Sequence, residues 1–472
     1  MSRPGERTHV EVRPAYADSV ALLQVSRTAQ ALPGVLAAQV AMATTLNVEV
    51  LEQMRFAVPA GTSPNDMVVA LRLTADADLD LVLHGVDEAL ASLRRSPART
   101  AGGLAPHRTT ATASRSADLG PVVVSVPGAS AAVEAVDALE AGRDVMIFSD
   151  NVPLAQEVAL KRVAAARGLL VMGPDCGTAV LDGLGLGFAN VVTPGPVGIV
   201  AASGTGAQQL LTLLDHAGVG VSWVLGVGGR DLSEEVGGLA TREALRRLDA
   251  EPGVSLVVLV SKPPAASVAA DLTAYATALG TPVQLALLGP GRPDLTAAAE
   301  AVLHHLGRPV PPWPVHGSTR QRPAGASTVR GLYAGGTLAQ EARLIVAAAG
   351  VAHEILDLGD DDLTQGRAHP MIDPTLRLER LRAVAADPAT AVVLLDVALG
   401  HGAEMDPAAL LAPAVAAIPA PVVVTVVGTA ADPQGRDRQV ASLVEAGAEV
   451  HVSNAGAARR AAEIAGGAAW RS

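Results

Sequence analysis

Several glycine-rich turns follow apolar runs in this sequence, and they carry the residues best suited to binding an anion. The clearest is Ser203-Gly204-Thr205-Gly206, between the apolar run 197–201 and the helical pattern 207–217. Glycines let the backbone approach a ligand closely, and the hydroxyls of Ser203 and Thr205 add donors at the positive end of a helix. The turn is therefore predicted to bind phosphate. The alternative is an ordinary strand-to-helix turn in which Ser203 only caps the helix.

Two further turns of this kind lie in the middle of the chain. In the turn 226–232, Arg230 follows two glycines and could pair with a substrate carboxylate or phosphate, or form a surface turn with Asp231. The turn 172–178 carries Cys176, the only cysteine. A nucleophilic Cys176 is the weaker hypothesis, because the sequence places no particular histidine beside it and free cysteine is commonly a small buried hydrophobe.

The last third of the chain offers similar features. Gly400-His401-Gly402 ends one apolar run and precedes a helical pattern, where His401 either faces a ligand or is a solvated loop residue. Gly335-Gly336-Thr337 precedes a helix in the same manner. The loop 366–374 gathers Arg367 and His369 around two prolines. Loops positioned by a scaffold often carry function, so we predict ligand contacts from this loop.

Other kinds of site lack a pattern in the sequence. The histidines show no metal-ligand spacing, and His304 and His305 are adjacent, so they do not share a helical face. There is no Walker A lysine loop, and a single cysteine allows neither an intramolecular disulfide nor a thiolate cluster. We therefore expect no metal site and find no support for ATP binding.

The turns must be positioned by strands that alternate with helices. In the middle of the chain, helix-length amphipathic stretches separate most of a series of apolar runs, at 122–126, 144–148, 169–172, 197–201, 223–227, 255–260 and 283–287. This alternation indicates βαβ units and parallel sheets, whose ligands bind at the carboxyl ends of the strands. The last third repeats the rhythm and is predicted to be flavodoxin-like, with strands at 329–333, 354–358, 391–396, 421–427 and 449–452.

The start of the chain follows a different pattern. Short β-like runs at 9–12, 35–43 and 67–73 alternate with helical patterns at 18–31 and 79–93. This arrangement favours a small α+β, ferredoxin-like module. Two stretches rich in Pro, Gly, Ser, Thr and Arg, at 96–118 and 307–328, are predicted linkers.

Composition limits the class of protein. The 472 residues exceed the roughly 250–300 at which single cores stop growing, so we expect two to four domains. A hydrophobic share of 49% with only 2% aromatics favours buried strands covered by Ala-rich helices. The net charge of −12 argues against a nucleic-acid partner. The apolar runs are shorter than a membrane span and the N-terminus lacks an apolar signal core, so we expect a cytoplasmic protein.

From residue 122 onward, the order of these turns resembles the α subunit of succinyl-CoA synthetase. The shared order comprises Ser125-Val126-Pro127-Gly128, Gly173-Pro174-Asp175-Cys176, Val197-Gly198-Ile199-Val200, Ser203-Gly204-Thr205 and Gly228-Gly229. The last block resembles the C-terminal domain of the β subunit, through Leu356-Asp357-Leu358-Gly359, Gly400-His401-Gly402 and Val427-Gly428-Thr429. Together these segments cover about three quarters of the chain.

The sequence resembles the FdrA branch of that superfamily more closely, over nearly its whole length. The matching segments are 18–20, 145–151, 172–178, 187–192, 229–232 and 369–374. The resemblance implies a small FdrA-specific α+β domain at 1–95, a CoA-binding-like Rossmann domain at 119–192, and flavodoxin-like ligase domains at 193–306 and 329–472. Two features of the ligases are missing, the ATP-grasp domain and the phosphorylated histidine, since residues 251–293 contain no histidine.

The resemblance also implies a function. It predicts a carbamoyltransferase subunit that works in a hetero-oligomer on oxamate and carbamoyl phosphate, in anaerobic allantoin breakdown. Ser203–Gly206 and Gly400–Gly402 from the opposite domain would hold phosphate, and Arg230, or Arg367 with His369, would hold the carboxylate. The alternatives are a CoA-dependent acyl ligase or transferase, with CoA at Pro127 and at Gly173, Pro174, Asp175 and Cys176, and a CoA-sensing or assembly subunit without activity of its own.

Overall fold

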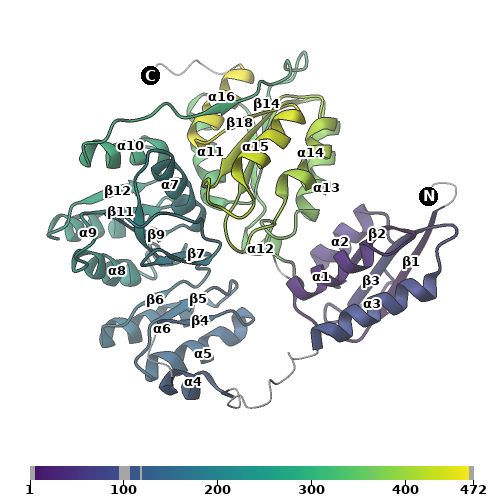
Figure 1. Ribbon diagram of the computed structural model, residues 1–472, viewed down its shortest axis with the longest axis horizontal. Coiled ribbons are helices and arrows are strands. Elements are labelled where there is room, and N and C mark those ends of the chain that lie inside the picture. Colours follow the sequence, from purple (N-terminus) through teal and green to yellow (C-terminus); the bar gives the residue numbers. More distant parts are fainter. Residues whose placement is uncertain (1–5, 95–106, 117–119, 365, 467–472) are drawn as a thin grey trace. The chain divides into compact units, whose positions relative to one another are not determined.

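The computed structural model describes residues 6–94, 107–116, 120–364 and 366–466 (Figure 1). Its contacts divide the chain into two compact units. The first comprises Met1–Pro106 with Gly359–Arg380, and the second His107–Leu358 with Leu381–Ser472. Each unit has buried apolar clusters of its own.

The first unit is a small α+β domain. Its antiparallel sheet has the order β1-β3-β2, from β1 (Glu6–Arg13), β2 (Val35–Met42) and β3 (Met67–Thr74). Alternating residues of β3 bury one face of the sheet against α1 (Ser19–Gln30) and α3 (Leu79–Arg94), and the other face near α2 (Thr45–Gln53). The order of these strands is that of the first three strands of a ferredoxin-like fold. The short helix α12 (Asp361–Thr364) also belongs to this unit.

The second unit begins with a Rossmann-like half-domain. Its strands are β4 (Val122–Val124), β5 (Val145–Ile147) and β6 (Val171–Met172), all parallel in that order. The helices are α5 (Gly128–Glu140), α6 (Leu154–Arg167) and α4 (Thr110–Ser116), which packs on α5. Helix α4 lies inside the stretch 96–118 that was predicted to be a linker, which is wrong for these residues; residues 96–106, 117 and 118 lie outside the described ones.

The next sheet has four parallel strands extended by a hairpin. The parallel strands are β9 (Val197–Ala202), β10 (Val221–Gly226), β11 (Leu256–Ser261) and β12 (Val283–Leu287), and β7 (Thr178–Leu181) with β8 (Leu184–Gly187) form the hairpin. The order is β12-β11-β9-β10-β7-β8. The helices are α7 (Gly204–His216), α8 (Leu239–Asp249), α9 (Ala266–Thr277) and α10 (Leu295–His305). The hairpin was not predicted, and it places residues 178–187 in this sheet although the expected boundary left them in the Rossmann domain.

The last sheet has the flavodoxin-like strand order. Its strands are β13 (Val315–His316), β14 (Thr328–Tyr333), β15 (His353–Asp357), β16 (Thr390–Ala398), β17 (Val422–Val427) and β18 (Ala448–His451), in the order β13-β18-β17-β16-β14-β15. All pairs are parallel except the short edge strand β13, which falls inside the predicted linker 307–328. The helices are α11 (Gly336–Ala348), α14 (Pro407–Ala417), α15 (Arg436–Glu445) and α16 (Asn454–Ile464), while α13 (Thr375–Ala386) begins in the first unit and ends in the second.

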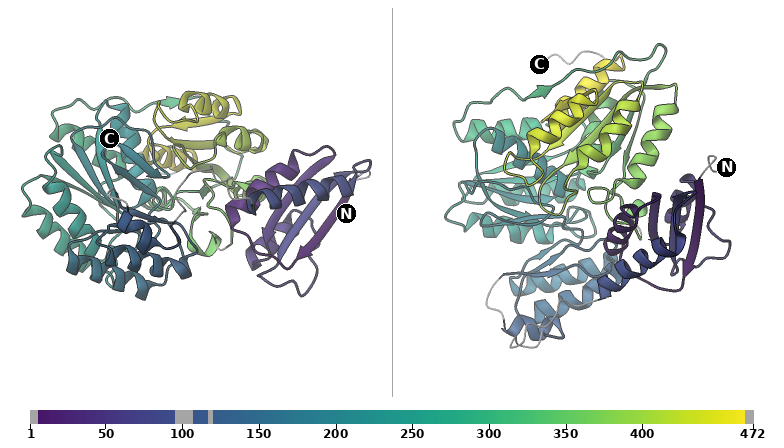
Figure 2. Two further views of the ribbon diagram at one scale, coloured as in Figure 1. Left: turned by 60° about the horizontal axis from the view of Figure 1, so that its bottom comes forward. Right: turned by 45° about the vertical axis from the view of Figure 1, so that its right-hand side comes forward.

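The two six-stranded sheets of the second unit pack through their helices. Helices α7 and α10 cover one face of the sheet β12-β11-β9-β10-β7-β8. They contact α11 and α16, which cover the sheet β13-β18-β17-β16-β14-β15 (Figure 1 and Figure 2). One apolar cluster runs through both sheets and all four helices. Polar groups also cross this layer, since Leu295 N–H of α10 donates to Glu341 Oε1 of α11 at 2.7 Å and Gln209 Nε2 of α7 donates to the Val452 carbonyl at 2.9 Å. The predicted α/β fold with parallel-sheet domains and a small α+β domain is confirmed.

Among the described residues, no helix is both long enough and apolar enough to cross a membrane.

Candidate functional site

The turn after β9 has the strand-turn-helix form that was predicted for a phosphate site. Ser203 is the N-cap of α7, and its Oγ accepts a hydrogen bond from the backbone N–H of Gly206 at 2.8 Å. The same Oγ donates to Thr337 Oγ1 at 2.6 Å. The Ser203 hydroxyl is therefore already used within the protein, while Gly204 and Thr205 remain partly exposed.

Helix α11 brings its own N-terminus to this turn. Gly335 is the N-cap of α11, and a Cβ atom on Gly335 would lie 2.8 Å from Thr205 Cγ2. The buried carboxylate of Asp396 holds the end of β14 in place, because its Oδ1 and Oδ2 accept from the N–H groups of Ala334 and Gly335, each at 2.8 Å. The first turns of α7 and α11 thus meet, at the points where the strand order of both sheets reverses.

A lysine and an aspartate complete this arrangement. Lys262 follows β11, and its Nζ lies 3.8 Å from Asp357 Oδ2 at the end of β15. A Cβ atom on Gly336 would lie 2.7 Å from Lys262 Nζ and 2.1 Å from Asp357 Oδ2. The side chain of Lys262 is 46% exposed and that of Asp357 12%. We call Ser203–Gly206, Lys262, Gly335–Thr337 and Asp357 the helix-terminus site.

The helix-terminus site can hold a small anion. The first N–H groups of any helix lack partners within the helix, and the helix dipole favours negative charge there. The carboxylate of Asp357 already lies at the N-terminus of α11. The ammonium of Lys262 is partly exposed and can pair with a second anion from solvent. Lys262 was missed in the sequence analysis, although its place directly after a buried strand could have identified it.

The predicted phosphate turn Gly400-His401-Gly402 has a different environment. Helix α14 begins only at Pro407, and the carboxylate of Asp406 already caps it by accepting from Ala409 N–H at 3.3 Å. The helix N-terminus that meets Ser203 is therefore that of α11, and the turn 400–402 is not itself the start of α14; that this turn contacts phosphate stays a prediction.

The turn is held against the segment that follows β8. His401 N–H donates to the Ala189 carbonyl at 2.8 Å, and Gly400 N–H donates to Gln434 Oε1 at 3.0 Å. A side chain on Gly400, whose φ is +111°, would collide with the Ala189 carbonyl. The imidazole of His401 is exposed, which agrees with the solvated-loop alternative.

A second group of predicted residues meets at the carboxyl edge of the β4-β5-β6 sheet. Pro127 precedes α5, and a Cβ on Gly128 would lie 2.1 Å from the Asp150 carbonyl. Ser149 Oγ donates to the Val126 carbonyl at 2.5 Å, and Asp175 N–H donates to the Ser149 carbonyl at 3.0 Å. We call the turns 125–128, 149–151 and 173–176 the carboxyl-edge site, the place expected for a CoA-like ligand.

Arg230 reaches the same edge but is tied to the protein. Gly228 packs so closely on the turn below that a Cβ would lie 2.5 Å from the Pro174 carbonyl. Arg230 Nε pairs with Glu157 Oε2 at 2.9 Å and Nη2 donates to the Val152 carbonyl at 2.7 Å, although the side chain stays 40% exposed. Two of its three nitrogens thus have internal partners, which weakens its candidacy for a substrate carboxylate.

A buried ion network lies beneath Arg230. Lys161 Nζ is 2.8 Å from Glu157 Oε1 and 2.8 Å from Asp231 Oδ1, and all three side chains are at most 1% exposed. Asp231 also accepts from the backbone N–H of Thr241 at 2.9 Å in the first turn of α8. The network joins the Rossmann-like domain to the next sheet, so its role is to fix the carboxyl-edge turns.

Cys176 is a packing residue. Its side chain is buried, its Sγ lies 3.6 Å from the Thr178 carbonyl, and a Cβ on Gly226 would come within 2.5 Å of the sulfur. Burial raises the pKa of the thiol to about 12, with the nearby Asp175 carboxylate adding to the effect. A thiolate nucleophile at neutral pH is therefore excluded by the environment.

Arg367 and His369 lie in the first unit, not with the other candidates. Arg367 Nη1 donates to Asn47 Oδ1 at 3.0 Å and Nη2 pairs with Asp373 Oδ2 at 3.2 Å, while the side chain is only 5% exposed. Burial lowers the pKa of Arg367, and it lowers the pKa of His369 to about 4. The loop 366–374 is thus anchored to the α+β domain, and its ligand contacts remain a prediction. No cluster of metal-ligating side chains occurs among the residues described.

Comparison with known proteins agrees with this architecture. Residues 332–464 match the model described as CoA-ligase, and residues 6–106 match the model described as AllF, heavy metal-associated domain. The only cysteine of the chain, Cys176, lies outside the latter range. The chain is 29% identical over 148 residues to the succinate–CoA ligase α subunit of Methanothermobacter thermautotrophicus, which covers 31% of this chain and 49% of that one. The fold and these matches define a succinyl-CoA synthetase-like protein.

A relative that matches most of the chain shows which family it belongs to. The chain is 36% identical over 446 residues to YahF of Escherichia coli, covering 84% of this chain and 85% of YahF. The chain therefore belongs to the FdrA/YahF family of succinyl-CoA synthetase-like proteins. A solved structure, the apo form of a dinucleotide-forming acetyl-coenzyme A synthetase 1 from Ca. Korarchaeum cryptofilum, covers 79% of this chain and 89% of its own, with 15% identity and a TM-score of 0.33.

Proposed function

We propose that this chain is a subunit of a carbamoyltransferase that moves a carbamoyl group between oxamate and phosphate. The observation that supports this best is the meeting of the α7 and α11 N-termini beside Lys262. The N-terminus of α7 and the ammonium of Lys262 suit the oxygens of phosphate, while the N-terminus of α11 faces the Asp357 carboxylate; carbamoyl phosphate carries the same phosphoryl group. The match of residues 6–106 to a model named for AllF supports a place in allantoin breakdown.

The reaction needs positioning more than covalent chemistry. A phosphate oxygen attacks the carbamoyl carbon of oxalurate, the bond from that carbon to the oxamate nitrogen breaks, and the nitrogen takes up a proton. Carbamoyl phosphate and oxamate are the products. In this proposal the first turn of α7, the Thr205 hydroxyl and Lys262 hold the phosphate and stabilise the charge that develops. The absence of histidine from residues 251–293 is consistent with a route without a phosphoenzyme.

The second candidate is a CoA-dependent acyl ligase or transferase. It is favoured by the likeness to succinate–CoA ligase α subunits and by the exposed Pro127 at the carboxyl-edge site. Against it, the same edge carries the carboxylates of Asp150 and Asp175, which repel the phosphates of CoA. In either case we propose that other subunits complete the enzyme and that it works in the cytoplasm.

The test uses calorimetric titration of the full chain with inorganic phosphate, carbamoyl phosphate and CoA. Carbamoyl phosphate is expected to bind the wild type, to bind Lys262→Arg with similar affinity, and to bind Lys262→Ala about tenfold or more weakly, because the variant lacks a charge-assisted contact. Binding of CoA alone would contradict the proposal and favour the ligase.

Chemical modification tests whether carbamoyl phosphate binds beside Lys262. Apart from the buried Lys161, Lys262 is the only lysine in the sequence. An amine-reactive reagent should therefore modify Lys262 in the folded protein, and mass spectrometry of the peptide measures the rate. Protection by carbamoyl phosphate supports the site, and an unchanged rate at saturating ligand argues against it.

A further inference from the structure

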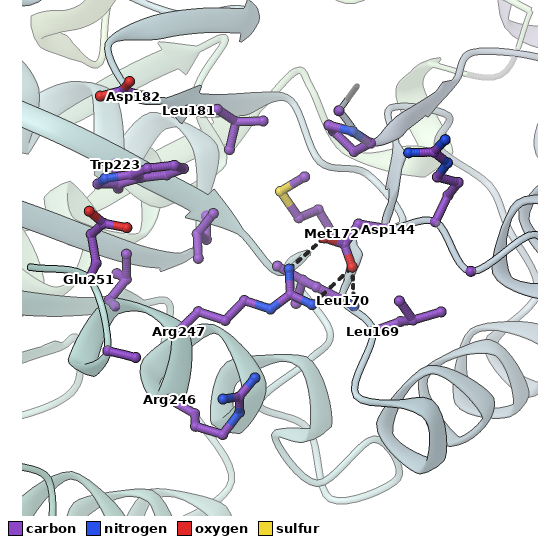
Figure 3. Close-up of a pocket in the computed structure, with 17 residues that line it drawn as sticks. Asp144, Leu169, Leu170, Met172, Leu181, Asp182, Trp223, Arg246, Arg247 and Glu251 are labelled. Atoms are coloured by element: carbon purple, nitrogen blue, oxygen red, sulfur yellow. Dashed lines mark hydrogen bonds and ion pairs between the residues drawn. The ribbon is translucent and has the colours of Figure 1, made fainter. Parts of the chain in front are cut away.

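A large cavity lies in the second unit on the side opposite the carboxyl-edge site. Its volume is about 990 Å³, within the size range of small-molecule pockets. One wall comes from the amino ends of β5 and β6, through Asp144, Leu169 and Leu170. The facing wall comes from the adjoining sheet and α8, through Trp223 and Arg247 (Figure 3). We call this cavity the Trp223 pocket.

Trp223 gives the pocket an aromatic surface. The chain has only three tryptophans and is 2% aromatic, so an indole on a cavity wall is unusual for this sequence. Trp223 is partly exposed, with Leu181 beside it in the pocket lining. Within the described part of the chain, no residue accepts a hydrogen bond from its indole N–H. Tryptophan usually satisfies that group when it is buried, so the wall offers a stacking face together with an unused donor.

Some charged side chains around the pocket form ion pairs with the protein and others do not. Figure 3 shows Trp223 between the carboxylates of Asp182 and Glu251. Neither carboxylate forms an ion pair with any described residue. At the other end, Arg247 Nη2 pairs with Asp144 Oδ1 at 2.9 Å and its Nε pairs with Glu243 Oε1 at 2.7 Å, so this arginine forms part of the wall.

Arg246 is an accessible cation in the pocket lining. Arg246 shares Glu243 with Arg247, at 2.7 Å from Nη2 to Oε1, and its side chain is 56% exposed. Arg246 Nε also donates to Glu243 Oε2 at 2.8 Å, so the pair is bidentate. Because Arg247 Nε pairs with the same carboxylate, Glu243 keeps a cation when Arg246 turns to a ligand. The pocket thus combines a stacking surface, two hydrogen-bond-accepting carboxylates and the exposed guanidinium of Arg246, while Arg143, also in the lining, donates to the Ser114 carbonyl.

We infer that the Trp223 pocket binds a purine nucleotide. A purine ring stacks on the indole, its exocyclic amine donates to Asp182 or Glu251, and its phosphate pairs with Arg246. Both walls contact the ligand, so binding links the Rossmann-like domain to the next sheet. The site lies at the amino ends of β5 and β6, away from the helix-terminus site, and it is independent of the function proposed above.

The experiment measures binding of AMP and adenosine to the full chain by equilibrium dialysis. Trp223→Ala is expected to weaken both ligands about tenfold or more, because base–aromatic stacking is lost, and Trp223→Phe is expected to keep most of the affinity. The double variant Asp182→Asn, Glu251→Gln should weaken both ligands, and Arg246→Ala should weaken AMP but not adenosine. Trp313→Phe is the matched control, since that indole donates to Glu300 Oε1 at 2.8 Å outside the pocket.

Two results would overturn the inference. One is no binding of either ligand at millimolar concentration. The other is AMP binding that CoA displaces and that Trp223→Ala leaves unchanged, which would assign the nucleotide to the carboxyl-edge site instead.

Discussion

At the scale of single residues, environment decided which of the candidate side chains are available for chemistry. Ser203 has the predicted place but gives its hydroxyl to the α7 cap and to Thr337. His401 is solvated, and Arg230 is held by Glu157. Lys262, which carries no motif, is exposed at the meeting point of two helices. Availability depends on neighbours that are distant in sequence, so residue type alone could not rank these candidates.

Cys176 provides a direct test of burial. Because its pKa is raised to about 12, the thiol should resist a disulfide-exchange reagent at neutral pH in the folded protein and react fully in denaturant. Absorbance of the released chromophore measures both rates. Fast labelling of the native protein at pH 7 would contradict the burial of this side chain.

At the scale of elements, buried charged side chains join helices to turns, and their removal should lower the free energy of unfolding. Lys161→Met removes the ammonium between Glu157 and Asp231, leaving the buried Asp231 without a cation and Glu157 with Arg230 alone. We expect a loss of about 3–5 kcal/mol in the free energy of unfolding, measured by chemical denaturation.

The matched control for that variant is Arg230→Gln. Its side chain is 40% exposed, so we expect a loss of at most about 1 kcal/mol. Equal losses for the two variants would mean that the network is not shielded from water.

The contact between the two helix N-termini can be tested through Gly335. In Gly335→Ala the new Cβ would approach Thr205 Cγ2 to 2.8 Å and Asp396 Oδ2 to 2.9 Å, so the termini must move apart. We expect about 1–3 kcal/mol of destabilisation and weaker binding of carbamoyl phosphate.

A second substitution separates this effect from general strain. Adding Thr205→Ser removes Cγ2 and should recover part of the lost stability, which denaturation of the single and double variants measures. Gly289→Ala is the control, because its Cβ would meet only Arg292 at 3.4 Å. Strictly additive effects in the double variant would contradict a direct contact between Gly335 and Thr205.

At the scale of the whole molecule, the two units should respond to pH in opposite directions. In the second unit, burial raises the pKa of Glu341 from 4.5 to about 7. Between these values the unfolded chain ionises and the folded unit does not, so stability falls as pH rises from about 4.5 through about 7. The slope is at most about 1.4 kcal/mol per pH unit. Hydrogen exchange of β16 measures it, and Glu341→Gln should remove the contribution of Glu341 while leaving those of Asp215 and His451, whose pKa values burial raises and lowers respectively.

The first unit should instead lose stability in acid. Burial lowers the pKa of His369 from 6.5 to about 4, so the unfolded chain takes up a proton before the folded unit does. Stability present above pH 6.5 is lost as pH falls towards 4, by an amount of the order of 1–3 kcal/mol. Hydrogen exchange of β3 reports on it. His369→Asn keeps an acceptor for the Met371 N–H and should flatten the acid limb; an unchanged limb would refute the assignment.

The sequence by itself determined the strands, the parallel sheets and the glycine turns that end them. Apolar runs such as 197–201 and 391–396 are local signals, and glycines after a buried strand indicate a turn at the carboxyl edge of the sheet. The family was also visible in the order of these turns. The β7–β8 hairpin escaped prediction because both strands are only four residues long, β8 alternates leucine with glycine, and β7 depends on pairing with β10.

Only the tertiary structure decided which turns meet. It set Gly335 and Thr337 of α11, rather than His401, against Ser203, because the two flavodoxin-like sheets pack through α7, α10, α11 and α16. It also placed the loop of Arg367 on the α+β domain, through a hydrogen bond to Asn47, which lies 320 positions away in the sequence. Contacts across such separations depend on how layers pack, and packing is a property of whole surfaces that no local run of residues encodes.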